Sequence, residues 1–138
     1  MPYVAYKRAS GTSTTTPTHQ VGDALIVMAV RWGNATPPSL PAGWTQLAVT
    51  SSGTPSVRVG WRAAASTADS TGTWTNAEDL YMFASRTDTP GAAAIAQAAN
   101  TIPGLTLTHP GPTIATTGVG YPGTPGTPTG TVSRNYDA

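Results

Sequence analysis

Apolar residues along this chain fall into short runs and strict alternations, which are typical of β-strands. The longest run, Ala24 to Val30, follows the turn formers Gly22-Asp23, and such a run predicts a strand that is covered on both faces. Val57, Val59 and Trp61 instead alternate with polar or small residues, which predicts one buried and one exposed face. A second apolar run predicts a strand at residues 80–84.

Weaker patterns complete the expected elements. Further strands are predicted at residues 3–9, 43–49, 72–75 and 105–108, with Trp44 and Leu47 as core anchors of the second of these. Residues 10–17 are a polar loop or a weak strand, and residues 63–72 are a loop or hold one helical turn. The alanine-rich residues 91–100 have good helix propensity, so a short helix and an extended segment both remain open.

Composition supports an all-β chain. Thr is the commonest residue, Gly and Pro number 15 and 13, and Lys7 and Glu78 are the only lysine and glutamate, which disfavours helices. This composition fits either a Thr-rich β-sandwich or a partly disordered polar chain, and the periodic segments favour the sandwich. We expect an antiparallel, jelly-roll-like β-sandwich over residues 1–108 and an extended Pro/Gly/Thr-rich C-terminal arm over residues 109–138.

The predicted arm differs in character from the rest of the chain. Proline and glycine recur there without the strict three-residue period of collagen, and proline favours extended backbone while removing donors from a β-ladder. We expect a partner surface to order it. The candidate partner-binding residues are Tyr121, Pro122, Pro125, Val132, Arg134 and Tyr136.

Charge narrows the classes of partner. Charged residues make up only 9% of the chain, the net charge is +1, and seven scattered Lys and Arg form no basic stripe, so we expect no nucleic-acid partner. No lysine cluster is available for an acidic membrane surface, and no apolar run is long enough to span a bilayer. The N-terminus lacks the pattern of a secretory signal, so synthesis in the cytoplasm is expected.

Residues that could carry chemistry are few and dispersed. The two histidines, His19 and His109, are far apart, no G-x-S-x-G elbow surrounds a serine, and cysteine is absent. The carboxylates adjoin predicted turns or strand boundaries, where they have structural explanations, and they lack calcium-loop spacing. The candidate catalytic carboxylates are Asp23, Asp69, Glu78, Asp79 and Asp88. We therefore expect a protein that is not an enzyme and holds no metal or cofactor.

The four tryptophans offer one further possibility, because tryptophan faces can hold sugars. Trp44 and Trp61 lie in apolar-patterned strands, where core packing is expected. Trp32 and Trp74 lie near strand ends, so these two are the candidate glycan-binding residues if they are exposed.

Three segments resemble a known family when taken together. They are Gly22–Val27 with its G-D-x-L start, Pro37–Thr45 ending in P-x-G-W-T, and Val59–Ala64 leading to the T-W-T of residues 73–75. Their order is similar to that in a β-sandwich domain of structural proteins from tailed bacteriophages, which occurs in decoration and minor tail proteins. The resemblance covers residues 3–108; the C-terminal arm departs from it, which leaves open whether the sandwich is trimmed or completed by a neighbouring chain.

The resemblance implies a structural role in a phage particle. Because this domain occurs among others in larger tail proteins and stands alone here, we expect a capsid decoration (cement) protein on the outer surface of the head. The expected partners are the major capsid protein and further copies of the chain, as a homo-oligomer such as a trimer. The alternative is a minor tail protein that binds host-surface glycan, and a hydrolase ranks third.

Overall fold

The computed structural model describes residues 3–50, 52–86, 90 and 95. The described residues form five β-strands and no helix. The strands are β1 (Tyr3–Ser10), β2 (Ala24–Arg31), β3 (Thr45–Val49), β4 (Ser56–Ala63) and β5 (Asp79–Ser85). The predicted all-β class is confirmed, and each of these strands begins and ends within two residues of a predicted one.

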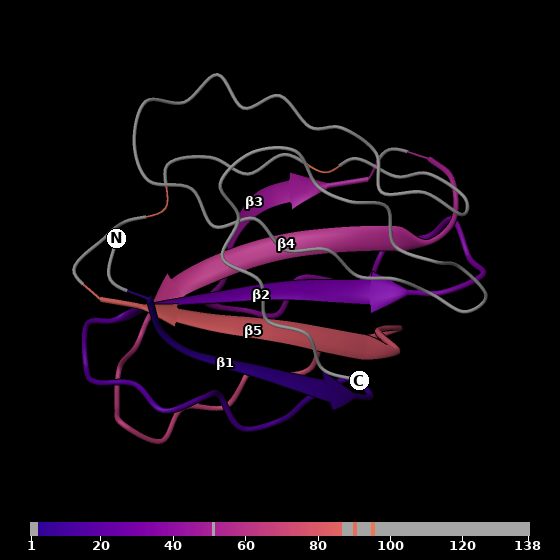
Figure 1. The fold of residues 1–138 in the computed structure, drawn as a ribbon. Helices are drawn as coiled ribbons and strands as arrows, with labels where there is room; N and C mark the ends of the chain where they lie inside the picture. The colour runs from indigo at the N-terminus through magenta and orange to yellow at the C-terminus, as the bar shows by residue number, and fades with distance from the viewer. Residues whose placement is uncertain (1–2, 51, 87–89, 91–94, 96–138) are drawn as a thin grey trace, which may run out of the picture.

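All five strands belong to one antiparallel sheet in the order β1-β5-β2-β4-β3 (Figure 1). The two apolar runs of the sequence therefore lie side by side near the centre, where Ile26 of β2 pairs with Phe83 of β5 and with Trp61 of β4. Every residue of β5 is buried, and β2 is buried at six of its eight positions. The prediction that the run starting at Ala24 is covered on both faces is confirmed.

The sheet separates two apolar clusters, because successive side chains of a strand point to opposite faces. On one face, residues of β2 and β5 pack against tryptophans and alanines of the connecting loops, and we call this group the loop-side cluster. Its members are Leu25, Val27, Ala29, Trp44, Ala64, Trp74, Ala77, Leu80, Met82 and Ala84. The opposite face carries the far-side cluster, which consists of Met28, Val30, Val57, Val59, Tyr81 and Phe83.

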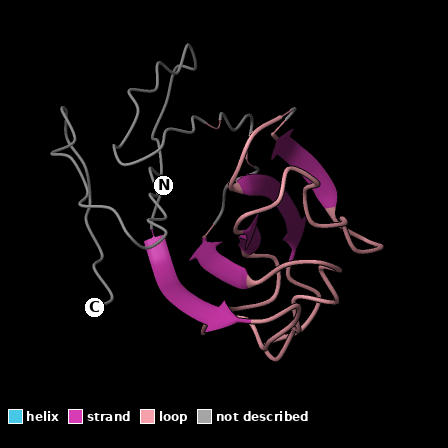
Figure 2. Cartoon of the chain, turned by 90° about the vertical axis from the view of Figure 1, so that its right-hand side faces the viewer, coloured by secondary structure: helices cyan, strands magenta, loops and turns pink. Residues whose placement is uncertain are grey.

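The loop layer consists of residues 11–23, 32–44 and 64–78, which connect successive strands. Figure 2 shows the curved sheet with most of its loops gathered on one side. Backbone hydrogen bonds join these loops: the amide of Trp74 donates to Thr12 O at 2.7 Å, and that of Thr71 donates to Thr14 O at 2.9 Å. These hydrogen bonds hold the loops against one another. The loop layer as a whole covers the loop-side cluster.

Two uncertain segments of the sequence meet in this layer. Neither residues 11–17 nor residues 72–75 form a strand; one isolated bridge, Thr15 with Ser70, joins their neighbourhoods. The predicted strand at 72–75 is wrong because Gly72 adopts a left-handed φ of 68° and the chain turns again where Ala77 N donates to Trp74 O at 2.9 Å. Residues 64–72 contain no helical turn.

Several predictions fall on other parts of the chain. The choice between helix and extended segment at 91–100 (apart from Ile95), the strand at 105–108, the domain limits and the arm at 109–138 lie outside the described residues.

Candidate functional site: the loop layer that carries the sequence motifs

The three motif segments meet in one place. Leu25 comes from the G-D-x-L segment, Trp44 from P-x-G-W-T, and Trp74 from T-W-T; all three belong to the loop-side cluster. The segment after β4 adds Ala64, which is 3% exposed. Residues that are distant in sequence thus form one continuous core.

The P-x-G-W-T motif is a turn that delivers a tryptophan to the sheet. The amide of Trp44 donates to Pro41 O at 3.3 Å, and Gly43 adopts a φ of 80°, which glycine reaches without a steric penalty. The Trp44 ring then meets the Trp74 ring edge-on, with centroids 5.4 Å apart and planes inclined by 69°. On Trp44 also lies the Arg62 guanidinium, 5.2 Å from the ring centroid.

Trp74 is fully buried, so it does not meet the condition of exposure on which its role as a candidate glycan-binding residue depended. Its ring NH donates to Thr71 O at 3.1 Å, so the polar edge of the ring is satisfied inside the core. Local sequence cannot show this burial, since it depends on the turn at Gly72 and on the loop at Thr12.

The other two tryptophans in question are partly exposed. The ring NH of Trp32 donates to Asp79 Oδ2 at 2.6 Å, which fixes the orientation of this half-buried side chain. Trp61, expected in the core, is also only partly buried, although its β4 neighbours Val57 and Val59 are buried as predicted. The alternation was correct, but it does not reveal what covers each position.

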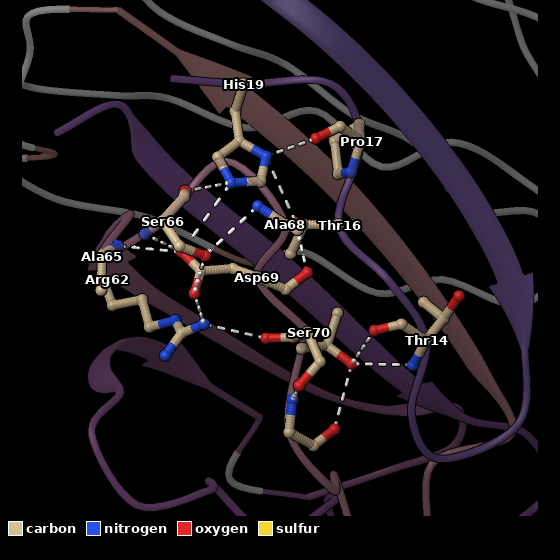
Figure 3. A network of polar contacts seen from close by, with 12 residues as sticks. Thr14, Thr16, Pro17, His19, Arg62, Ala65, Ser66, Ala68, Asp69 and Ser70 are labelled. Atoms are coloured by element: carbon tan, nitrogen blue, oxygen red, sulfur yellow. Dashed lines mark hydrogen bonds and ion pairs between the residues drawn. The ribbon is translucent and has the colours of Figure 1, made fainter. Parts of the chain in front are cut away.

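In the loop layer, His19 joins two loops in a buried polar cluster (Figure 3). His19 is only 5% exposed. Its Nδ1 lies 2.6 Å from Pro17 O, and its Nε2 lies 2.9 Å from Ser66 O. Thr16 Oγ1 lies 3.3 Å from Nδ1 and donates to Asp69 O at 2.7 Å. Each ring nitrogen therefore faces a backbone carbonyl, an arrangement that links residues 11–23 to residues 64–78.

Asp69 organises the other side of this cluster. Its Oδ2 accepts from Ala65 N at 2.8 Å and Ser66 N at 3.3 Å, while Oδ1 pairs with the Arg62 guanidinium at 3.3 Å. Burial by itself raises the pKa of Asp69, but the backbone hydrogen bonds and Arg62 outweigh it and leave the pKa below its ordinary value. The carboxylate thus closes the turn and anchors it to β4.

Asp23 performs a similar role at the start of β2. Its Oδ2 accepts from Gln20 N at 2.8 Å, and Arg86 Nε donates to Oδ1 at 3.3 Å. Burial again opposes ionisation, yet the Gln20 amide and Arg86 lower the pKa of Asp23 overall. The turn-forming role predicted for Asp23 is confirmed, and Arg86 is a partner that sequence reasoning did not identify.

Asp79 gathers three side chains at the first residue of β5. In addition to Trp32, its carboxylate accepts from Ser10 Oγ at 3.0 Å and pairs with Arg8 at 3.3 Å. The Arg8 guanidinium also lies 5.5 Å from the centre of the Tyr81 ring. The sequence placed Asp79 at a loop-to-strand boundary, but its partners lie far away in the sequence, on β1 and directly after β2.

Lowering the pH should weaken the interactions of the Asp69 carboxylate with the Ala65 and Ser66 amides and with Arg62. Because the folded-state pKa is below the ordinary value of about 3.9, Asp69 contributes its full stability above that pH and loses it as pH falls further. We expect Asp69→Asn to be less stable than the wild type at pH 7 and the difference to shrink below about pH 4. Urea unfolding from pH 7 to pH 3 measures this.

The matched control for Asp69→Asn in this pH series is Glu78→Gln, which neutralises an exposed carboxylate. It should leave the free energy of unfolding nearly unchanged across the same pH range, since exposed surface substitutions usually have small effects. A constant difference between Asp69→Asn and wild type at all pH values would contradict the proposed role of the charged carboxylate.

Neither a cluster of metal ligands nor a membrane-spanning helix is found in the described part of the chain. Within it, no three His, Asp or Glu side chains are grouped so that they could hold a metal ion. The same residues include no helix long and apolar enough to cross a membrane. The six candidate arm residues, with His109 and Asp88, lie outside the described residues.

Comparison of the chain with family models, curated protein sequences and solved structures found no match. The resemblance to phage structural proteins therefore rests on the motif residues themselves.

Proposed function

We propose that this chain is a structural protein of a tailed-bacteriophage particle and acts as a capsid decoration (cement) protein. One observation carries the proposal: the segments that resemble the phage domain, including Leu25, Trp44 and Trp74, pack together into one core. This packing supports the proposal because it is what a domain specified jointly by the three segments would show.

The polar groups of the loop layer, together with Asp79 at the adjoining start of β5, are consistent with a structural role. Asp23, Asp69 and Asp79 each bind backbone amides or side chains of neighbouring segments, and His19 lies between two backbone carbonyls. All four act as ties that hold the loops in place. Ties of this kind suit a protein that must keep its shape on a particle surface.

The proposal includes a finer architecture. The observed sheet is one layer of a β-sandwich, and residues 109–138 form an arm that lies across a neighbouring subunit. The major capsid protein and further copies of this chain are the proposed partners, with a trimer at a local three-fold position as the assembly. Contacts spread over several subunits give tight attachment from weak individual contacts, because later contacts form at high effective concentration.

Removing the end of the arm should test the proposed attachment. We expect deletion of residues 119–138 to raise the apparent Kd for isolated particles by about 100-fold, since one set of the linked contacts is lost. Quantitative gel analysis of particles incubated with increasing protein measures the occupancy. The far-UV circular dichroism and thermal midpoint of the deletion variant serve as the control and should match the wild type.

Unchanged occupancy by a folded deletion variant would overturn the arm's role. The single substitution Tyr136→Ala offers a smaller change in the same segment and should weaken binding less than the deletion does.

The glycan-binding alternative loses one of its two candidate residues. Trp74 is enclosed in the core, and Trp32 is half-buried with its ring NH committed to Asp79. A minor tail protein that binds host glycan would need to use Trp32 or the partly exposed Trp61. We therefore favour the decoration role.

A further inference from the structure

The far-side face of the sheet is apolar and excluded from water. Val30 is 2% exposed, Tyr81 6% and Phe83 8%, and the Tyr6 and Phe83 rings approach to 5.2 Å between centroids. Neighbouring strands lie in the same layer and cannot shield the face of the sheet from solvent. A second layer is needed, and packed layers lie about 10 Å apart.

Among the described residues, two contacts to the far-side cluster come from outside the strands. One is Trp32, which directly follows β2, and the other is Ile95, which lies ten residues beyond the end of β5 at Ser85. The remaining partly buried contacts, Tyr6, Ile26, Leu47 and Ala48, belong to the sheet itself. Ile95 shows that the chain returns over this face after β5.

The sequence after Ile95 contains a segment suited to cover the face. Leu105 and Leu107 alternate with Thr106 and Thr108, so an extended backbone would place both leucines on one side and both threonines on the other. From Ile95 to Leu105 the chain can extend roughly 33 Å, whereas a five-stranded sheet is only about 19 Å wide between its edge strands. The segment can therefore reach any strand of the sheet.

We propose that residues 101–108 of this same chain cover the far-side cluster, with Leu105 and Leu107 facing Tyr81 and Phe83. The segment forms the second layer of the domain, and the chain closes its own core without a second copy. This inference names the residues of the sandwich layer but does not depend on the phage role, because it concerns how one chain folds.

A pair of double variants tests the orientation of the segment. Leu105→Asp/Leu107→Asp should place charges against the apolar face and expose it, raising the fluorescence of the dye ANS several-fold or unfolding the domain. The matched control, Thr106→Asp/Thr108→Asp, adds the same charges one residue further along and should behave like the wild type. Equal effects of the two double variants would overturn the proposal.

Cross-linking identifies the occupant even if the aspartate variants fail to fold. The chain has no cysteine, so Ile26→Cys on β2 combined with Leu105→Cys creates the only two thiols. A short bis-maleimide should link them within one chain, and mass spectrometry should then show a monomer that carries a single reagent molecule and no free thiol. Val21→Cys, at a position 65% exposed in the loop layer, replaces Ile26→Cys in the control pair and should not be linked to Leu105→Cys within the chain.

The products distinguish the occupants. An intrachain product with Ile26→Cys, but not with Val21→Cys, supports the proposal. A dimer band that depends on protein concentration would show that a second copy covers the face, and no product would show that the segment lies elsewhere; either result overturns the proposal. None of these outcomes decides whether the protein binds phage heads.

Discussion

Replacing Trp74 with alanine is expected to remove about 3–5 kcal/mol from the free energy of unfolding. The side chain is 0% exposed, packs edge-on against Trp44, and donates its ring NH to Thr71 O. Domains of this kind have about 5–15 kcal/mol in total, so the variant should be marginally folded or unfolded at 25 °C. Guanidinium unfolding followed by far-UV circular dichroism measures the loss.

Trp61→Ala is the matched control, since it removes the same side chain from a partly exposed position on β4. Its loss should be less than about half that of Trp74→Ala, because part of the ring surface is already in water. A Trp74→Ala protein that folds normally but loses binding to a glycan would contradict the structural role of Trp74 and favour the glycan alternative.

Gly60→Ala is expected to cost about 1–3 kcal/mol even though it adds a single methyl group. A Cβ at this position would lie 2.8 Å from Leu40 Cδ1, 2.9 Å from Trp74 Cη2 and 3.3 Å from Thr45 O. Gly60 therefore allows the loop layer to lie directly on β4. The new methyl group must displace Leu40 or the Trp74 ring.

Near-UV circular dichroism separates this effect from ordinary glycine replacement. Gly60→Ala should change the aromatic signal of the Trp44–Trp74 pair as well as the denaturation midpoint. Gly33→Ala, where φ is 67° and a Cβ would meet no atom within 4 Å, should lower stability through backbone strain and leave that signal unchanged. Wild-type stability and an unchanged signal in Gly60→Ala would show that the loop layer is not packed this closely.

The strands could be predicted because their signals are local. The run from Ala24 and the alternation from Val57 to Trp61 each extend over a whole strand, and hydrophobic periodicity needs no knowledge of distant residues. The order of strands in the sheet is not available in this way. β5 lies between β1 and β2 because it pairs with residues about fifty to eighty positions earlier in the chain.

The loop layer could be predicted only in part. The turn at Asp23 has a local signal, and the structure confirms it through the Gln20 amide. The burial of Trp74, by contrast, depends on a hydrogen bond to Thr12 and on the left-handed backbone of Gly72. Burial of a loop residue is decided by long-range packing, which is why Trp74 is fully buried while Trp61, expected in the core, is only partly buried.

Gly60 and His19 illustrate the same limit. A glycine inside a strand can indicate the close approach of another segment, which is what the structure shows at Gly60, but the sequence does not identify the approaching residue as Trp74. No sequence pattern indicates that His19 is buried, yet its side chain lies between backbone carbonyls of two loops. This linking role of His19 becomes visible only when the fold brings residues 17 and 66 together.

Labelling of intact particles tests the proposed function most directly. Gold-labelled antibody against this chain, applied to particles and viewed by electron microscopy, should decorate the head shell evenly, and label should disappear from particles that lack the protein. Label confined to the tail would contradict the decoration role and turn attention to the glycan alternative, and particles without any label would contradict a place in the virion.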